Sequence, residues 1–269
     1  MRIAIAGKGG TGKTTIAGTL ARILARRGHD VLAIDADTNP NLATVLGIPP
    51  GDADAIVSLP RGLTKRQVNE DGTTWTKFDA DPEALVAEYG MRGPDGVRLM
   101  IMGRVGHSGA GCLCSAHATV RGFLGEIVTR GDTERDVIVD MEAGLEHMSR
   151  GTGRHVNRLV AVLEPYYRSM ETARNVVALA GELGVTDVVV IANKVRDEGD
   201  RTAIRDFCRV HSMRLVGEVP YDAGLADAER AGGAPIDLAA GSPAIVAIEL
   251  LADAIVGEAE MPELSLAAT

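Results

Sequence analysis

The sequence predicts an α/β protein in which a doubly wound, mostly parallel sheet is flanked by helices. Short apolar runs alternate with amphipathic stretches of ten or more residues along most of the 269-residue chain. The runs at 137–139 and 188–191 are continuously apolar, which is typical of strands buried on both faces. These two features together favour one sheet with helices packed on both sides.

The expected elements follow one another in order along the chain. Strands are expected at 3–6, 31–34, 98–102, 136–141, 159–163, 188–192 and 215–219. Helices are expected at 15–27, near 116–130, and at 169–183, 200–211 and 243–257. We therefore expect a single domain over residues 1–257, without an internal repeat.

Two segments depart from this alternation. Residues 48–96 are rich in Gly, Pro, Asp and Lys, with one alternating piece at 73–78. We expect them to form a polar insertion with a small hairpin or helix. The acidic residues 258–269 are expected to be a frayed, flexible tail.

The composition argues against several classes of function. With 28 Lys+Arg against 37 Asp+Glu, the formal net charge is −9, and only one Trp, four Tyr and three Phe are present. An acidic chain with few aromatic residues is poorly suited to bind nucleic acid. The chain begins directly with a strand and has no run of eighteen apolar residues, so we expect a cytoplasmic protein without a membrane anchor.

The first predicted strand leads into a phosphate-binding loop. Gly7, Gly12, Lys13 and Thr14 fit the pattern G-x-x-x-x-G-K-[ST], between a strand and a helix. Lys13 is expected to reach the β- and γ-phosphates of ATP or ADP, and the Thr14 hydroxyl to bind Mg²⁺. The residues expected to contact the phosphates are Gly9, Gly10, Thr11, Gly12, Lys13, Thr14 and Thr15.

Lys8 makes this loop unusual, because a lysine directly after the first glycine cannot easily reach the nucleotide that its own loop surrounds. Taken alone, it is most simply a solvated charge. The loop resembles the deviant P-loop of the family that contains septum-site regulators, chromosome-partitioning ATPases, the nitrogenase iron protein and the ATPases that target tail-anchored proteins. This resemblance implies a homodimer in which Lys8 reaches the nucleotide of the partner subunit.

Carboxylates follow two strands that should flank the loop, at the sheet edge where ligands bind in doubly wound folds. The resemblance implies that Asp37 orients the water that attacks the γ-phosphate. It also implies that Asp140 contacts the groups that bind the magnesium ion. Asp35 is either part of this group or the cap of a turn.

Two residues at the end of a later strand resemble the Asn-Lys pair that contacts adenine in the same family. Asn193 and Lys194 occupy these positions. Pro220, Tyr221 and Asp222 follow the next strand and are expected near the same base. The Asn193 amide offers both a donor and an acceptor, as an adenine edge requires.

Cys112 and Cys114 form a thiol pair in a glycine-rich loop. Two thiolates cannot complete a tetrahedral site, but a homodimer would bring four together, which suits zinc or square-planar nickel. His107 and His117 could assist. Cys208 is most simply a small buried hydrophobic residue.

These motifs together resemble the CooC-type nickel-insertion ATPases of carbon monoxide dehydrogenase. The resemblance rests on the deviant P-loop, the Cys pair, and three later pieces: the 140–144 segment, Arg150 to Thr152, and Glu164-Pro165. It implies a nickel-binding homodimer with carbon monoxide dehydrogenase as its client. The 48–96 insertion and Asp37-Thr38-Asn39 depart from the usual pattern. The alternatives are an iron–sulfur reductase of the nitrogenase iron protein type and a ParA- or MinD-like positioning ATPase.

Overall fold

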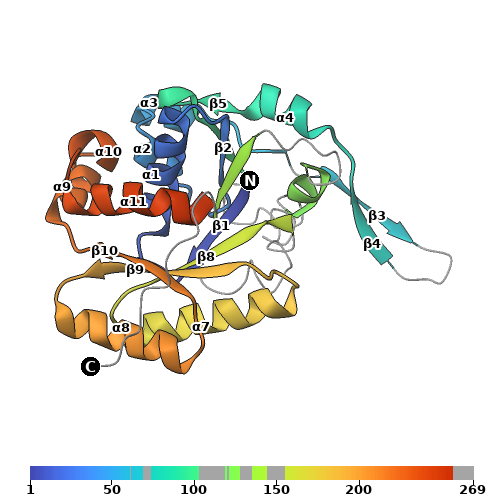
Figure 1. The fold of residues 1–269 in the computed structure, drawn as a ribbon. Helices are drawn as coiled ribbons and strands as arrows, with labels where there is room; N and C mark the ends of the chain where they lie inside the picture. The colour runs from blue at the N-terminus through green and yellow to red at the C-terminus, as the bar shows by residue number, and fades with distance from the viewer. Residues whose placement is uncertain are drawn as a thin grey trace.

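The computed structural model describes residues 1–60, 62–68, 74–102, 119, 121–127, 135–143 and 155–256. The main sheet has eight strands in the order β10-β9-β8-β1-β7-β2-β6-β5 (Figure 1). Their bounds are β1 (Arg2–Gly7), β2 (Val31–Asp35), β5 (Met91–Arg92), β6 (Arg98–Ile101), β7 (Asp136–Asp140), β8 (Arg158–Leu163), β9 (Val188–Val195) and β10 (Leu215–Pro220). Every neighbouring pair is parallel except β5 with β6, which confirms the predicted fold class.

Helices cover both faces of this sheet (Figure 1). On one face lie α1 (Lys13–Arg26) and α11 (Pro243–Val256), and on the other α7 (Tyr167–Glu182) and α8 (Glu198–Val210). Side chains of a strand alternate between its two faces, so Ile3 and Ile5 pack toward α1 while Ala4 and Ala6 pack toward α7. The continuously apolar strands are therefore buried on both sides, as the sequence indicates.

The predicted insertion contains both a hairpin and helices. It includes α3 (Pro50–Ala55), β3 (Thr64–Val68), β4 (Thr74–Phe78), α4 (Pro82–Tyr89) and the 3₁₀ turn η1 (Pro94–Gly96). Strand β5 pairs with β6 through Met91 and Leu99, so the end of this segment belongs to the main sheet.

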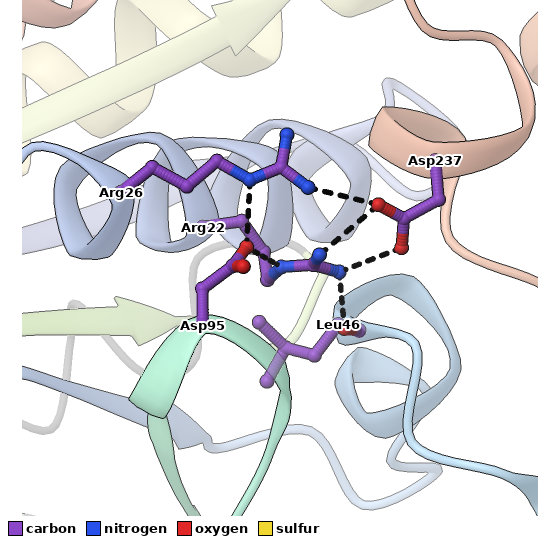
Figure 2. A network of polar contacts seen from close by, with 5 residues as sticks. All are labelled: Arg22, Arg26, Leu46, Asp95 and Asp237. Atoms are coloured by element: carbon purple, nitrogen blue, oxygen red, sulfur yellow. Dashed lines mark hydrogen bonds and ion pairs between the residues drawn. The ribbon is translucent and has the colours of Figure 1, made fainter.

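A buried arginine fastens this segment to the core (Figure 2). Arg22 of α1 is 3% exposed and donates to the Leu46 carbonyl, at the end of α2 (Leu42–Leu46), over 2.8 Å. It also pairs with Asp95 of η1 and holds Asp237 through two hydrogen bonds of 2.9 and 3.0 Å. Arg26 binds the same two carboxylates from the next turn of α1. The network joins α1, α2 and η1 to α10 (Pro235–Leu238).

Two short helices after β10 were not expected from the sequence. They are α9 (Ala223–Arg230) and α10. Asp222 caps α9 by accepting a 2.8 Å hydrogen bond from the Gly224 N–H. The helix expected near 116–130 is described at residues 119 and 121–127, and the tail at 258–269 lies outside the described residues.

Candidate functional site

The phosphate loop joins the carboxyl end of β1 to the first turn of α1. Gly12, the residue before α1, has a φ of 86°, and a Cβ there would lie 2.3 Å from Nδ2 of Asn193. Glycine alone meets both the left-handed backbone and the close contact. The loop thus brings the amino end of a 14-residue helix to the sheet edge, where its N–H groups attract anions.

Two side chains from β9 hold carbonyl groups of this loop. Asn193 donates from Nδ2 to the Thr11 carbonyl over 2.7 Å, and the Lys194 ammonium donates to the Gly10 carbonyl. The C=O and N–H of one trans peptide point in opposite directions. The N–H groups that follow these carbonyls therefore face away from Asn193 and Lys194. One of them, the Thr11 N–H, donates within the loop to the Lys8 carbonyl at 3.3 Å.

Lys13 is the buried cation of the site. Its side chain is 7% exposed, and its Nζ lies 3.3 Å from the Lys8 carbonyl oxygen, to which it donates. Burial lowers the pKa of Lys13, while the nearby carboxylates of Asp140 and Asp37 oppose that change. The ammonium group thus lies near two carboxylates at the end of the loop.

Asp140, at the end of β7, is 1% exposed, and neither of its carboxylate oxygens has a hydrogen-bond partner within the described residues. Burial, followed by the charge of Asp35, raises its pKa, although Thr14 and Lys13 lie near enough to act in the opposite direction. A buried carboxylate in this state requires a proton or a bound cation.

Asp35 lies beside Asp140 on the adjacent strand, because the register of β2 and β7 pairs these two residues. Its oxygens accept hydrogen bonds from the N–H groups of Leu42 at 2.8 Å and Asp37 at 3.1 Å. Burial raises its pKa to about 6, although these hydrogen bonds lower it. Asp35 therefore shapes the turn after β2, which confirms the turn-cap interpretation.

A hydrogen bond joins the two acidic segments. The Thr38 hydroxyl donates to Oε1 of Glu142 over 2.9 Å, while Asp37 accepts from the Asn39 N–H at 2.8 Å within its own turn. The Asp37 side chain in this turn is half-buried. Sequence reasoning missed Thr38, because only the fold brings it to Glu142. The signal was present in the unusual Asp-Thr-Asn at 37–39.

Asn193 and Lys194 make structural contacts at the edge where adenine is expected. The Asn193 Oδ1 accepts from the Lys194 N–H at 2.9 Å, so both ends of its amide are engaged. Lys194 also forms an ion pair with Glu164, the residue after β8, at 2.7 Å. The structure brings this pair to the phosphate loop, and their contact with adenine stays a prediction.

The residues after β10 lie on the same edge. Tyr221 is 49% exposed, and the Arg196 guanidinium stacks 4.9 Å from its ring centroid while donating to the Tyr166 hydroxyl at 3.0 Å. Both oxygens of Asp222 accept backbone N–H groups, at the starts of α9 and α11. Asp222 is thus a helix cap, and a contact between Tyr221 and a base stays a prediction.

This geometry agrees with comparisons to known proteins. The CobQ/CobB/MinD/ParA nucleotide-binding domain matches residues 3–236. The chain belongs to this family. The carbon monoxide dehydrogenase accessory protein CooC of Rhodospirillum rubrum is 39% identical over 246 residues, covering 88% of this chain and 90% of that protein. The predicted resemblance to CooC-type P-loop ATPases is confirmed.

Solved structures of the same fold are more distant in sequence. The MinD cell division protein of Aquifex aeolicus has a TM-score of 0.68 at 23% identity, covering 96% of this chain and 97% of that one. The septum site-determining protein MinD of Pyrococcus horikoshii, solved with Mg-ADP, has a TM-score of 0.67 at 18% identity, covering 94% and 95%. These likenesses support the fold of the ATPase.

The thiol pair of the ATPase falls outside the described residues, as do His107 and His117. Within the described ranges, no three His, Cys, Asp or Glu side chains gather as a metal site would require. Cys208 is 2% exposed in α8, and burial raises its pKa to about 11, so the interpretation of it as a buried apolar residue is confirmed. None of the helices described here is long and apolar enough to cross a bilayer.

Because two carboxyl groups are buried, we expect the free energy of unfolding of the nucleotide-free ATPase to fall as pH rises. A carboxyl whose pKa is raised by folding stabilises the fold fully below its unfolded pKa, and that contribution is lost as pH rises through the folded pKa. Asp35 and Asp140 both have raised pKa values. We therefore expect the free energy of unfolding to fall by about 1–3 kcal/mol between pH 5.5 and pH 8 without Mg²⁺.

Urea unfolding at several pH values measures this change. Asp140→Asn should flatten the dependence, because it removes one of the two titrating groups. Asp206→Asn, at a carboxylate whose side chain is 59% exposed, is the matched control and should keep the wild-type slope. Equal slopes for the wild type and Asp140→Asn would contradict the prediction.

Proposed function

We propose that this ATPase inserts nickel into carbon monoxide dehydrogenase, working as a Mg²⁺-dependent homodimer that carries the metal on Cys112 and Cys114. The similarity to CooC over 88% of the chain carries this proposal. The Cys-x-Cys pair supports it, because two such pairs at a twofold axis supply four soft ligands for one nickel ion.

The phosphate loop would hold ATP or ADP. Residues 9–15 would surround the phosphates, with Lys13 at the β- and γ-phosphates and the Thr14 hydroxyl on Mg²⁺. The chain fits this cation, because Asp140 supplies two buried carboxylate oxygens beside the Thr14 hydroxyl, and neither oxygen has another partner among the described residues. Bound Mg²⁺ supplies positive charge that stabilises the phosphates during transfer.

Hydrolysis requires a water oxygen to bond to the γ-phosphorus as the bond to the bridging oxygen breaks, which releases ADP and phosphate. Asp37 would orient this water, since its turn is held by Asp35 on one side and linked through Thr38 to Glu142 on the other. Lys8 of the partner subunit would add positive charge at the γ-phosphate. Lys13 serves the same purpose from within the subunit.

The nucleotide state is proposed to control the metal. The hydrogen bond between Thr38 and Glu142 joins the turn that carries Asp37 to the segment after Asp140. Closure of the dimer around ATP would therefore move both segments together, and the proposal requires that this movement change the spacing of the four thiolates. By linkage, nickel affinity should differ by about 5–150-fold between the ADP state and the ATP state.

Nickel titration of the Cys112→Ala/Cys114→Ala variant tests this function. We expect it to lose tight binding of one nickel ion per dimer and activation of nickel-free carbon monoxide dehydrogenase, while nucleotide binding remains. Cys208→Ala, which alters a buried cysteine in α8, is the control and should bind nickel normally.

Three results, two from metal titration and one from a visible spectrum, would contradict the proposal. Unchanged nickel binding by the double variant would exclude the thiol site. Equal nickel affinity without nucleotide, with ADP and with a non-hydrolysable ATP analogue would leave only a structural metal. A visible iron–sulfur absorption band in anaerobically purified protein would favour the reductase alternative instead.

A further inference from the structure

The hairpin of β3 and β4 stands apart from the main sheet. It forms its own two-stranded antiparallel sheet, and Figure 1 shows it projecting from the body beyond α4. Lys65, Gln67, Val68 and Lys77 are exposed, and Val68 is 67% exposed. An isolated two-stranded sheet is only marginally stable in water, so this hairpin exposes backbone and side chains that a partner could use.

The strands of the hairpin are basic in an acidic protein. They contain Lys65, Arg66 and Lys77 and no acidic residue, while Glu70 and Asp71 lie between the two strands in the sequence and the whole chain has a formal net charge of −9. Lys65 and Lys77 are directly opposite each other in the register. Like charges in such cross-strand pairs are destabilising. Asp79, just after β4, forms an ion pair with Lys65 and partly offsets this repulsion.

The base of the hairpin is anchored firmly. Phe78, at the end of β4, is 5% exposed and meets Phe123 edge to face, with ring centroids 6.2 Å apart. A Cβ at Gly122 would lie 2.7 Å from Phe78, so the helical segment 121–127 approaches closely. The Asp79 N–H also donates to the Leu63 carbonyl at 2.8 Å, which closes the hairpin at its base. Segment 121–127 follows the cysteine pair in the sequence.

We propose that hairpin β3–β4 is a docking arm that binds an acidic, extended segment on the surface of the protein that receives the metal. This inference rests on the proposed function. Each strand has one neighbour among the described residues, so within that part of the chain its outer edge is unpaired and suits strand addition. The positive side chains select an acidic segment and favour its encounter with the arm.

Charge reversal on the arm tests the proposal. The variant Lys65→Glu/Lys77→Glu should bind nickel-free carbon monoxide dehydrogenase at least tenfold more weakly than the wild type and with less dependence on salt. Its ATP hydrolysis and its nickel stoichiometry should be unchanged. The control, Arg209→Glu/Arg230→Glu, reverses two side chains that are 59% and 74% exposed elsewhere on the surface, and it should bind like the wild type.

Trp75 of β4 is the only tryptophan of the chain, so its fluorescence reports on the hairpin alone. Adding a polyglutamate peptide should change this emission in the wild type but not in Lys65→Glu/Lys77→Glu. If carbon monoxide dehydrogenase is neither bound nor activated by the wild type, the proposed function fails, and the peptide response alone then decides whether the arm binds acidic segments.

Several outcomes would overturn the docking arm while leaving the proposed function intact. Equal affinity of the wild type and Lys65→Glu/Lys77→Glu for the dehydrogenase would do so. A loss of oligomeric mass in this variant would assign the hairpin to a second copy of the chain. Binding of a DNA duplex that the variant loses would assign the hairpin to nucleic acid.

Discussion

Replacing Lys13 with alanine should reduce ATP turnover by at least about 10²–10³-fold. Lys13 is the buried ammonium group at the end of the phosphate loop, 7% exposed and held near Asp140 and Asp37. At the γ-phosphate it would offset the negative charge of the transferred group. No other cation of its own loop can take this place, because the Lys8 side chain is exposed.

The loss should appear as a change in turnover with the fold retained. In the variant, Asp140 would keep its burial but lose the cation that lowers its pKa, so it would hold a proton more strongly. Steady-state hydrolysis with Mg²⁺, together with thermal unfolding, separates lost chemistry from lost folding. Lys13→Arg keeps the charge but changes its shape and reach, and it should also be impaired. Undiminished hydrolysis by Lys13→Ala would mean that the phosphate site has been misassigned.

The sequence could predict the phosphate loop because its determinants are local. Glycines at fixed spacing, a lysine and a hydroxyl residue lie within Gly7 to Thr14, and the strand and helix around them follow from apolar periodicity. The structure agrees down to the left-handed backbone at Gly12. The sheet was predictable for the same reason, because buried parallel strands are continuously apolar.

Contacts between distant segments could not be predicted in this way. Thr38 meets Glu142 only because β2 and β7 are neighbours in register, and strand order is a property of the whole fold. Asn193 was predicted as an adenine contact because Asn193-Lys194 resembles the adenine-contacting Asn-Lys pair of the family. The structure shows its amide holding the Thr11 carbonyl, a contact that requires β9 to lie beside the loop. Strand β5 was missed because two residues carry no periodic signal.

The remaining large effect concerns Lys8. Its backbone carbonyl is fixed by the Thr11 hydroxyl at 2.8 Å and by Lys13 at 3.3 Å, but its side chain is exposed and has no ion-pair partner among the described residues. The loop therefore holds the Lys8 backbone, while its exposed side chain pairs with no described residue, as a role toward another subunit requires. Lys8→Ala should weaken nucleotide-dependent dimerisation and lower turnover by about 10²–10³-fold, while Lys13 still supports some nucleotide binding.

A mixed dimer determines which nucleotide Lys8 serves. One subunit carries Lys8→Ala with its own Asp37 intact, and the other carries Asp37→Asn with its own Lys8 intact. If Lys8 acts across the interface, the Lys8→Ala subunit receives its lysine from the partner subunit and keeps one working site, so the mixed dimer should have about half the wild-type activity. Both parent homodimers should be inactive, and differently tagged subunits allow the mixed species to be purified. If Lys8 serves its own subunit, neither site is complete. An inactive mixed dimer that still assembles with ATP would therefore reject the cross-subunit role and leave Lys8 a residue of its own phosphate loop.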